Sequence, residues 1–495
     1  MSTSQPSDRK RYRIARTVFA MAAALAVGCS LTSCAVGPDF VKPPAPHVAQ
    51  FVHGQPEQDV IAAERGSQRF DAEAQLPTDW WTLFGSRVID TAVSDTLMGN
   101  ATLDGAQASL RQSEASMRAG AGVFFPQVDA GFGASREKYS PLHVGQDLPP
   151  TIFNLFTLSG TISYTLDLWG GERRLVEGLR AQTDVARYAL LATYLTLTTN
   201  VVNAMIARAA YTDEIAATRE TIDLVREQVR ITRTQAEAGT TAYSAVLTLE
   251  SELATLEASL PALEQKRVQT QDLLATLAGE FPADWHADAV SLSDIALPAD
   301  LPAAIPSELV HRRPDILQAE AALHVASANV GVATANLFPS LTLSATGGYG
   351  NSSMGALLRA VGQTWSLGGS ISAPIFHGGS LWYQRKAALA ALDGSRSAYR
   401  QIVLTAFAQV ADTLRALEHD AAALDAQARA LASAREALRL MRVNYEAGTV
   451  DYVQILVADQ QYHQAEIAYL QDLAQRLQDT VALYAALGGG WGTAH

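Results

Sequence analysis

The sequence predicts an α+β protein that combines very long helical hairpins with a few amphipathic strands. Three observations predict this class. A helical pattern ending in Ala-Gly-Thr occurs twice, at residues 238–240 and 447–449. A proline-free run precedes each copy, over residues 171–238 and 379–447. Four segments of about ten residues alternate apolar with polar side chains, which is the period of a β-strand.

The repeated pattern has a fixed register of 209 positions. The residues that recur are Arg226, Glu227, Arg230, Arg233, Glu237, Ala238, Gly239, Thr240, Tyr243 and Leu247. Because glycine readily takes the left-handed conformation that ends a helix, each copy predicts a helical hairpin. At 1.5 Å per residue, the first arm of each hairpin would be about 100 Å long. We therefore expect an internal two-fold repeat, with one body built from two similar halves.

The N-terminus indicates export. The chain has 495 residues and a net charge of −13, which argues against nucleic-acid binding. Residues 1–33 have the order of a lipoprotein signal peptide: a basic segment, an apolar run too short to span a bilayer as a helix, and small residues. The two cysteines, Cys29 and Cys34, both lie at this end, so no disulfide framework is expected in the mature chain.

Residues 31–34, Leu-Thr-Ser-Cys, resemble a bacterial lipobox, in which cleavage leaves Cys34 as a lipid-modified N-terminus. The alternative is that Cys34 is an incidental residue near an ordinary cleavage site. The stretch before Cys29 matches less well, because Ala26 stands where a branched residue is usual. Ala35, rather than Asp, follows Cys34, which by resemblance to sorting signals favours the outer membrane.

The mature chain divides by composition and period. We expect a lipid-anchored extended strap, a first repeat, a connector rich in Pro, Asp and Ala, a second repeat and a C-terminal tail, over residues 34–79, 80–281, 282–306, 307–489 and 490–495. Each repeat should run helix, strand, loop, strand, long helix, tip and helix. The strands are expected at about 127–136, 156–167, 340–350 and 364–376.

These four strands have the length and alternation of transmembrane β-strands. A soluble sheet over a core is the alternative, but the attached helices are too long to fold back over four strands. Four strands cannot close a barrel, and an open edge in lipid leaves backbone groups unsatisfied. Three protomers would supply twelve strands, with Ser and Thr facing a wet lumen. The prediction is a trimeric channel with a 12-stranded outer-membrane β-barrel, four strands per protomer, continuous with a long periplasmic α-helical barrel.

Several motifs occur in a characteristic order: residues 34–40 (Cys-Ala-Val-Gly-Pro-Asp-Phe), 260–264 (Leu-Pro-Ala-Leu-Glu), 312–316 (Arg-Arg-Pro-Asp-Ile) and the paired tips. In this order they resemble the outer-membrane factor (TolC-like) family, and within it the NodT-type efflux lipoproteins. The resemblance implies a homotrimer in outer-membrane lipid that works with a periplasmic adaptor (membrane fusion protein) and an inner-membrane resistance-nodulation-division transporter. It implies a passive exit duct for drugs or other toxic small molecules.

The resemblance also implies site residues. Two tips would lie at the periplasmic end and dock the adaptor: Ala238, Gly239 and Thr240, and Ala447, Gly448 and Thr449. The alternative is that the glycines only end helices. The periplasmic gate would follow the second tip, where Val453 and Val457 stand at positions at which relatives often carry Leu and Asp. Asp451 and Asp459 are the nearest carboxylates. The alternative for the valines is ordinary coiled-coil packing.

No motif indicates an enzyme, since the sequence lacks a nucleophile elbow, a P-loop and a dinucleotide fingerprint. His311, His324 and His377 lack zinc-type spacing, so we expect no metal and no cofactor besides the lipid on Cys34. The rival class is a periplasmic adaptor or structural coiled-coil lipoprotein, although an adaptor usually has a single hairpin. Within the channel class, metal-ion export or type I protein export is the alternative to small-molecule efflux.

Overall fold

A computed structural model describes residues 35–46, 48, 50–52, 59–62, 66–71, 76–140, 145, 149–286, 288–302 and 306–490. The expected signal peptide and Cys34 lie outside the described residues. The described chain is mostly helical with few strands, and it divides into two compact units. Unit 1 comprises the chain up to Val41, Glu114–Gln182 and Ala322–Ser395, and unit 2 comprises Lys42–Ser113, Thr183–Ala321 and the chain from Arg396 onward.

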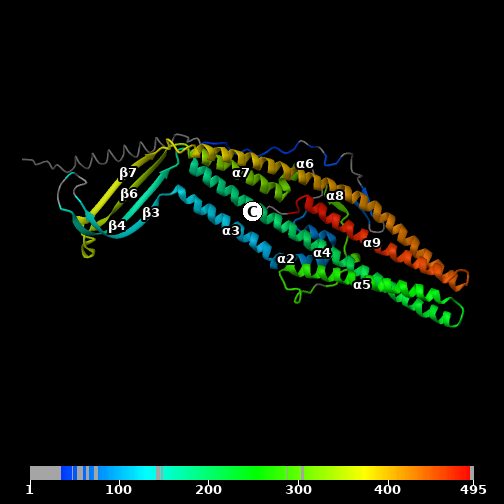
Figure 1. Ribbon diagram of the computed structural model, residues 1–495. Coiled ribbons are helices and arrows are strands. Elements are labelled where there is room, and N and C mark those ends of the chain that lie inside the picture. Colours follow the sequence, from blue (N-terminus) through cyan, green and yellow to red (C-terminus); the bar gives the residue numbers. More distant parts are fainter. Residues whose placement is uncertain are drawn as a thin grey trace, which may run out of the picture. The chain divides into compact units, whose positions relative to one another are not determined.

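Unit 1 contains a four-stranded antiparallel sheet in the order β3-β4-β6-β7, whose strands lie side by side in Figure 1. The strands are β3 (Gln127–Tyr139), β4 (Thr151–Leu166), β6 (Ser340–Asn351) and β7 (Gln363–Ser372). Strand β3 continues past residue 136 through a polar stretch, because its backbone still pairs with β4 there. Strand β7 ends at Ser372 rather than near 376, where Pro374 has no N–H to donate to the sheet.

The register sorts apolar and polar side chains onto opposite faces of this sheet. One row across all four strands is apolar, with Val128, Ile162, Ala345 and Leu367 as successive partners. The next row is polar, with Asp129, Thr161, Thr346 and Ser366 as partners. Threonine hydroxyls bond across the polar face, Thr161 to Thr346 and Thr165 to Thr342, each over 3.1 Å. The alternation in the sequence thus becomes two chemically distinct faces.

Two helices of 67 residues, α4 (Gly171–Glu237) and α8 (Ser380–Glu446), begin in unit 1 and continue through unit 2. Each turns back into a shorter helix that lies beside it in Figure 1, α5 (Tyr243–Ala278) and α9 (Tyr452–Ala486). The remaining α-helices described are α2 (Arg87–Gly99), α3 (Ala101–Gly120), α6 (Pro306–Arg312) and α7 (Pro314–Ala335). Helix α4 is long enough, and one 18-residue window of it apolar enough, to cross a membrane by length and composition alone, and 39% of that window is buried in protein.

The core of unit 2 forms where the helices α2, α4, α5, α8 and α9 meet. Trp80 and Phe84, from the 3-10 helix η1 (Trp80–Phe84), pack on Tyr484 of α9 with ring centroids 5.5 and 6.2 Å away. All three side chains are almost fully buried. Burying such large rings contributes strongly to stability, so this cluster fixes the base of both hairpins within the unit.

The structure adds a small sheet to the expected strap and connector. Strands β1 (Asp59–Ala62) and β2 (Gly66–Asp71) pair antiparallel, and β2 pairs in parallel with β5 (Asp300–Pro302). Arg69 Nε donates to Asp300 Oδ1 over 2.6 Å between the paired strands. The sequence indicated no strands here, because β1 and β2 are short and show no clear alternation, and β5 lies more than two hundred positions from its partner β2.

Candidate functional site

Both hairpin tips end their first helix with the same hydrogen-bond pattern. At the first tip, the N–H of Gly239 donates to Ala236 and that of Thr240 donates to Gln235. At the second tip, Gly448 donates to Tyr445 and Thr449 donates to Asn444. This is the Schellman arrangement, and it requires the positive φ of 78° and 70° that the two glycines adopt. The residues expected to dock an adaptor, Ala238–Thr240 and Ala447–Thr449, are exposed.

The helix that follows the second tip begins with a side-chain cap. Asp451 is the N-cap residue of α9, and its carboxylate accepts a hydrogen bond from the N–H of Gln454 over 3.2 Å. The corresponding N-cap residue of α5 is Ala242, which has no capping side chain. Asp451 therefore stabilises the start of α9. Its negative charge also interacts favourably with the positive end of the helix dipole.

Val453 and Val457 lie on the exposed face of α9, with 55% and 49% of their surface open to solvent. Ile455, between them, is buried against α8. The positions 209 residues earlier hold hydroxyl residues, Ser244 and Thr248, which are also exposed. The valines are therefore not packed as seam residues within this chain. They are apolar side chains at positions where the first hairpin carries polar ones.

Asp459 is not on the exposed face with the valines. Its side chain is only 11% exposed and pairs with Arg442 of α8, with Nη2 and Oδ1 3.3 Å apart. Burial raises the pKa of Asp459, and the adjacent guanidinium partly opposes this rise. The structure thus separates the two expected gate carboxylates: Asp451 caps a helix, and Asp459 joins the two arms of the hairpin.

Some of the contacts between the hairpins lie close to the tips. Gln235 Nε2 of α4 donates to the hydroxyl oxygen of Tyr445 on α8 over 3.0 Å. The Tyr445 ring meets that of Tyr452 edge-on, with centroids 5.7 Å apart. Tyr452 also packs against the apolar cluster between α4 and α5. The candidate gate segment is therefore connected to both hairpins through these two tyrosines, which sequence reasoning did not single out.

The first hairpin carries a ladder of ion pairs on its exposed surface. Arginines of α4 pair with glutamates of α5 at steps of seven residues: Arg219 with Glu264, Arg226 with Glu257, and Arg233 with Glu250. A seven-residue step is two helical turns, so the ladder follows one line along both helices. Exposed pairs of this kind stabilise weakly, and their main effect is on the register of the two arms.

A second polar cluster lies within unit 2, between α8 and α9. Burial and the neighbouring Asp479 carboxyl raise the pKa of Asp420 to about 7. Arg476 is fully buried beside it and donates to the Leu417 carbonyl and to Gln68 Oε1, over 3.1 and 2.8 Å. Among the described residues, no group of three or more His, Cys, Asp or Glu is arranged to hold a metal ion.

The chain is similar to known proteins over most of its length. The sequence model of the family described as outer membrane efflux protein matches residues 92–280 and 305–489. The pyoverdine export outer membrane protein OpmQ of Pseudomonas aeruginosa is 32% identical over 418 residues, which are 83% of this chain and 87% of that protein. The toluene efflux pump outer membrane protein TtgC of Pseudomonas putida is 31% identical over 93% of both chains. The solved structure of the outer-membrane channel OprN superposes with a TM-score of 0.83 at 28% identity, covering 92% of this chain and 100% of the other.

Proposed function

The chain belongs to the outer membrane efflux protein family, and we propose that three copies of it assemble into one duct across the outer membrane. It is an outer membrane protein with the role of an exit duct for efflux. The family is one of channels rather than enzymes.

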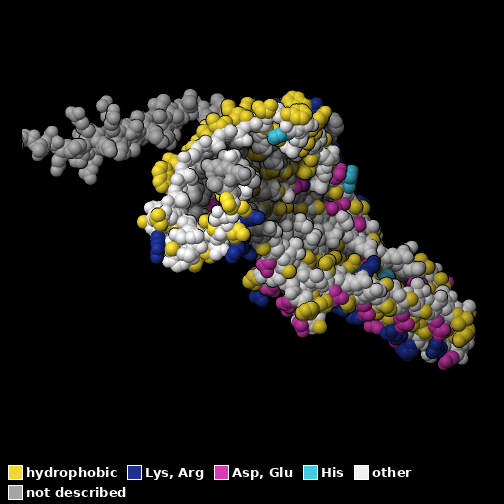
Figure 2. Space-filling model, turned by 60° about the vertical axis from the view of Figure 1, so that its left-hand side comes forward, with side chains coloured by type: hydrophobic (Ala, Val, Ile, Leu, Met, Phe, Trp, Pro, Cys, Tyr) yellow, Lys and Arg dark blue, Asp and Glu magenta, His cyan; other side chains and the backbone are white. Residues whose placement is uncertain are grey.

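The main support for a trimeric duct is the sheet of unit 1, which is apolar on one face and open at both edges. Its apolar row is uncovered, since Val128 on β3 and Leu367 on β7 are each 72% exposed. Figure 2 shows hydrophobic side chains gathered along the outside of the curved sheet. An uncovered apolar face suits lipid, whereas the opposite face, with its threonine and serine hydroxyls, suits a water-filled lumen.

The edges of the sheet require partners in lipid. Strands β3 and β7 are the two edges, and each would leave a row of backbone N–H and C=O groups unsatisfied in hydrocarbon. Strand direction alternates across the sheet, so β7 of one copy would run antiparallel to β3 of the next. Closure by three copies gives a 12-stranded barrel without an edge, and the long helices of both repeats would then continue as an α-helical barrel in the periplasm.

The duct itself supplies no energy in this proposal. An inner-membrane resistance-nodulation-division transporter drives export, and a periplasmic adaptor connects it to the exposed hairpin tips at Gly239 and Gly448. Val453 and Val457 form the gate, because three copies would bring these exposed apolar side chains together at the entrance. No catalytic step and no cofactor enter the proposal.

The proposed cargo is small organic molecules, drugs or other toxic compounds among them. Support comes from the two relatives described above, whose names refer to pyoverdine and to toluene. Metal-ion export and type I protein export by the same fold are the alternatives. We also propose that Cys34 carries an N-terminal lipid, because the lipobox-like residues 31–34 precede it.

The test is deletion of the gene in its native host, followed by complementation with the wild-type chain. We expect deletion to increase the intracellular accumulation of organic dyes and solvents, and complementation to reverse it. Sensitivity confined to metal salts would favour metal-ion export, and unchanged export of all cargo classes would contradict the proposal. Extraction of the protein from membranes by carbonate alone would favour the periplasmic adaptor class.

A further inference from the structure

The segment that directly follows Cys34 is held in a fixed position on unit 1. It has no helical or strand structure, yet the N–H of Val36 donates to the carbonyl of Trp169 over 2.9 Å. Trp169 lies in the turn between β4 and α4, where its ring stacks on Phe338 and its indole N–H donates to the Pro339 carbonyl over 2.7 Å. The start of the described chain is thus attached to the junction of strands and helices.

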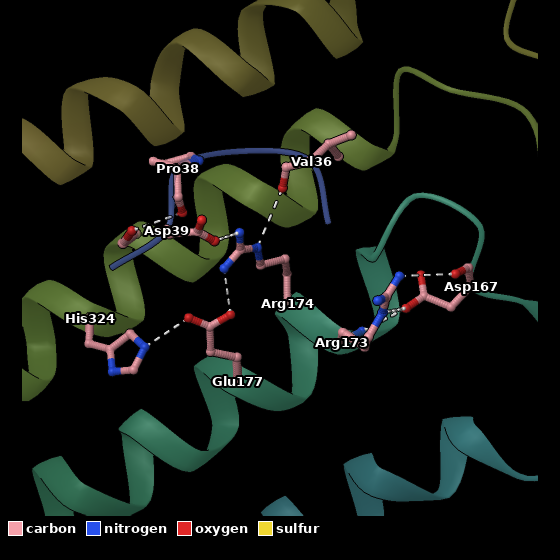
Figure 3. A network of polar contacts seen from close by, with 9 residues as sticks. Val36, Pro38, Asp39, Asp167, Arg173, Arg174, Glu177 and His324 are labelled. Carbon is pink, nitrogen blue, oxygen red and sulfur yellow. Dashed lines mark hydrogen bonds and ion pairs between the residues drawn. The ribbon is translucent and has the colours of Figure 1, made fainter. Parts of the chain in front are cut away.

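Arg174 of α4 is the centre of this attachment, as Figure 3 shows. Its side chain is 5% exposed and donates to Asp39 over 2.5 Å and to Glu177 over 2.8 Å. It also lies 3.4 Å from the Val36 carbonyl oxygen, which it donates to. A buried guanidinium needs several acceptors, and two of those that Arg174 uses belong to the segment at residues 36–39.

Helix α7 forms the other side of the attachment. Gly37 lies so close to Gly331 that a Cβ on Gly37 would stand 2.5 Å from the Gly331 Cα. Phe40 stacks on His324 with ring centroids 4.2 Å apart, and it packs on an apolar cluster that includes Val330. His324 Nε2 lies 2.8 Å from Glu177 Oε1, so the same carboxylate contacts both the arginine and the histidine.

The neighbouring Arg173 contacts the start of α4 rather than the N-terminal segment. Arg173 bonds to Asp167, with Nε and Oδ2 3.0 Å apart, and that carboxylate also accepts from the first N–H groups of α4. Arg173 and Asp167 therefore stabilise the helix start, whereas Arg174 faces the N-terminal segment. Two consecutive arginines thus serve two distinct contacts.

We propose that Arg174, Glu177, His324 and Gly331 form a clasp, an internal binding site for residues 36–40 that fixes where the lipid-bearing N-terminus enters the membrane. The strand–helix junctions of unit 1 carry large exposed apolar side chains, namely Phe125, Leu168, Phe338 and Phe376. Aromatic side chains at the ends of transmembrane strands mark the membrane interface. The clasp therefore holds the residue after Cys34 at the interface itself, so that the lipid would insert into the membrane beside the barrel.

The role of the clasp in membrane entry rests on the proposed lipid. The binding of residues 36–40 by the clasp can be tested without it. Deuterium exchange of the detergent-extracted full chain would follow the peptide that covers residues 35–41. We expect Arg174→Ala to speed exchange of this peptide at least about tenfold, since the segment has no secondary structure of its own. Arg180→Ala, on the exposed side of the same helix, is the matched control and should leave exchange unchanged.

Two further variants keep the test independent of folding. Asp39 is 89% exposed, so Asp39→Asn cannot damage the core and should speed exchange of the same peptide, though less than Arg174→Ala. Gly37→Ala should displace the segment from the α7 side while Arg174 stays in place, because the added Cβ would stand 2.5 Å from the Gly331 Cα. Exchange that is unchanged in Arg174→Ala, or equally fast in Arg180→Ala, would overturn the clasp.

A final comparison separates the clasp from the lipid proposal. The chain can be exported behind an ordinary cleavable signal so that it starts at residue 35 without Cys34. Retained protection of residues 35–41 in this form, together with a change in membrane association, would support the clasp and the lipid anchor alike. Loss of protection in this form would overturn the clasp as an independent site, whereas unchanged association would contradict only the lipid.

Discussion

Arg442 and Asp459 form an ion pair across the second hairpin, and the residues 209 positions earlier, Arg233 and Glu250, form one across the first. The two pairs differ in their surroundings. The Asp459 side chain is 11% exposed, whereas that of Glu250 is 35% exposed. Because the carboxylate of the second pair is more buried, the stability of the second hairpin depends more strongly on keeping both partners.

The first prediction follows from this difference. Arg442→Ala leaves the Asp459 carboxylate buried without its counter-ion, and should lower stability by about 1–3 kcal/mol. The matched variant Arg233→Ala removes an exposed partner, and should change stability by only about 0–1 kcal/mol. Thermal unfolding of the two variants in detergent measures this, and equal shifts in Tm would contradict the assignment of Asp459 to a buried pair.

The second prediction concerns the proposed gate. Replacing Val453 and Val457 together with serine should raise single-channel conductance in planar bilayers, because an apolar constriction becomes a wettable one. Leu247→Ser, at an exposed apolar position on the first hairpin, is the control and should have no effect. Conductance that is unaltered in the double variant would remove these valines from the constriction.

The third prediction separates docking from helix termination at the tips. Gly239→Val with Gly448→Val forces β-branched residues into the left-handed region, at roughly 1–2 kcal/mol each or more, and should abolish efflux. Ala238→Trp with Ala447→Trp adds bulk at exposed positions without backbone strain. If the tips dock a partner, the tryptophan variant should also lose efflux at normal protein level and normal Tm. Full efflux in that variant would contradict docking at the tips and would mean that the two glycines only end the helices.

The fourth prediction concerns Asp420, whose pKa is raised to about 7 by burial and by Asp479. An acid with a raised pKa keeps its proton in the folded state while the unfolded chain has lost it. Stability from this group is therefore complete below about pH 4 and falls as the pH rises toward 7. Asp420→Asn should remove this dependence and be more stable than the wild type at pH 8. Asp425→Asn, at a partly exposed carboxylate paired with Arg429, is the control.

The strands and hairpins could be predicted because their signals are local. Alternation in Leu158 to Leu166 and the glycines at 239 and 448 each fix one element without help from distant residues. Strand limits were less certain: the polar residues Arg136 to Lys138 continue β3 only because β4 lies opposite. The sheet of β1, β2 and β5 was not predicted, since β1 and β2 are short and the third strand, β5, pairs with β2 from a distant part of the chain.

The docking and gate roles of the candidate site residues stay predictions from the sequence. The tips and the valines were singled out by sequence, whereas the burial of Asp459 and its bond to Arg442 required coordinates. One signal was present: Arg233 recurs at Arg442, and Glu250 is matched by Asp459 in the same register. Arg174 gave no signal, because its partners Val36 and Asp39 lie more than 130 positions away in a segment without a local pattern.

The central claim is that three sheets close into one barrel through β3 and β7. The sequence has only two cysteines, Cys29 and Cys34, and both lie outside the sheet, so one cysteine placed in β3 and one in β7 can be scanned against each other in outer membranes. Ile162→Cys with Ala345→Cys is the control, since β4 and β6 pair there within one chain. We predict that one β3–β7 register yields covalent dimers and trimers and nothing larger. If no register links two chains while the control links within one, the trimeric barrel is contradicted.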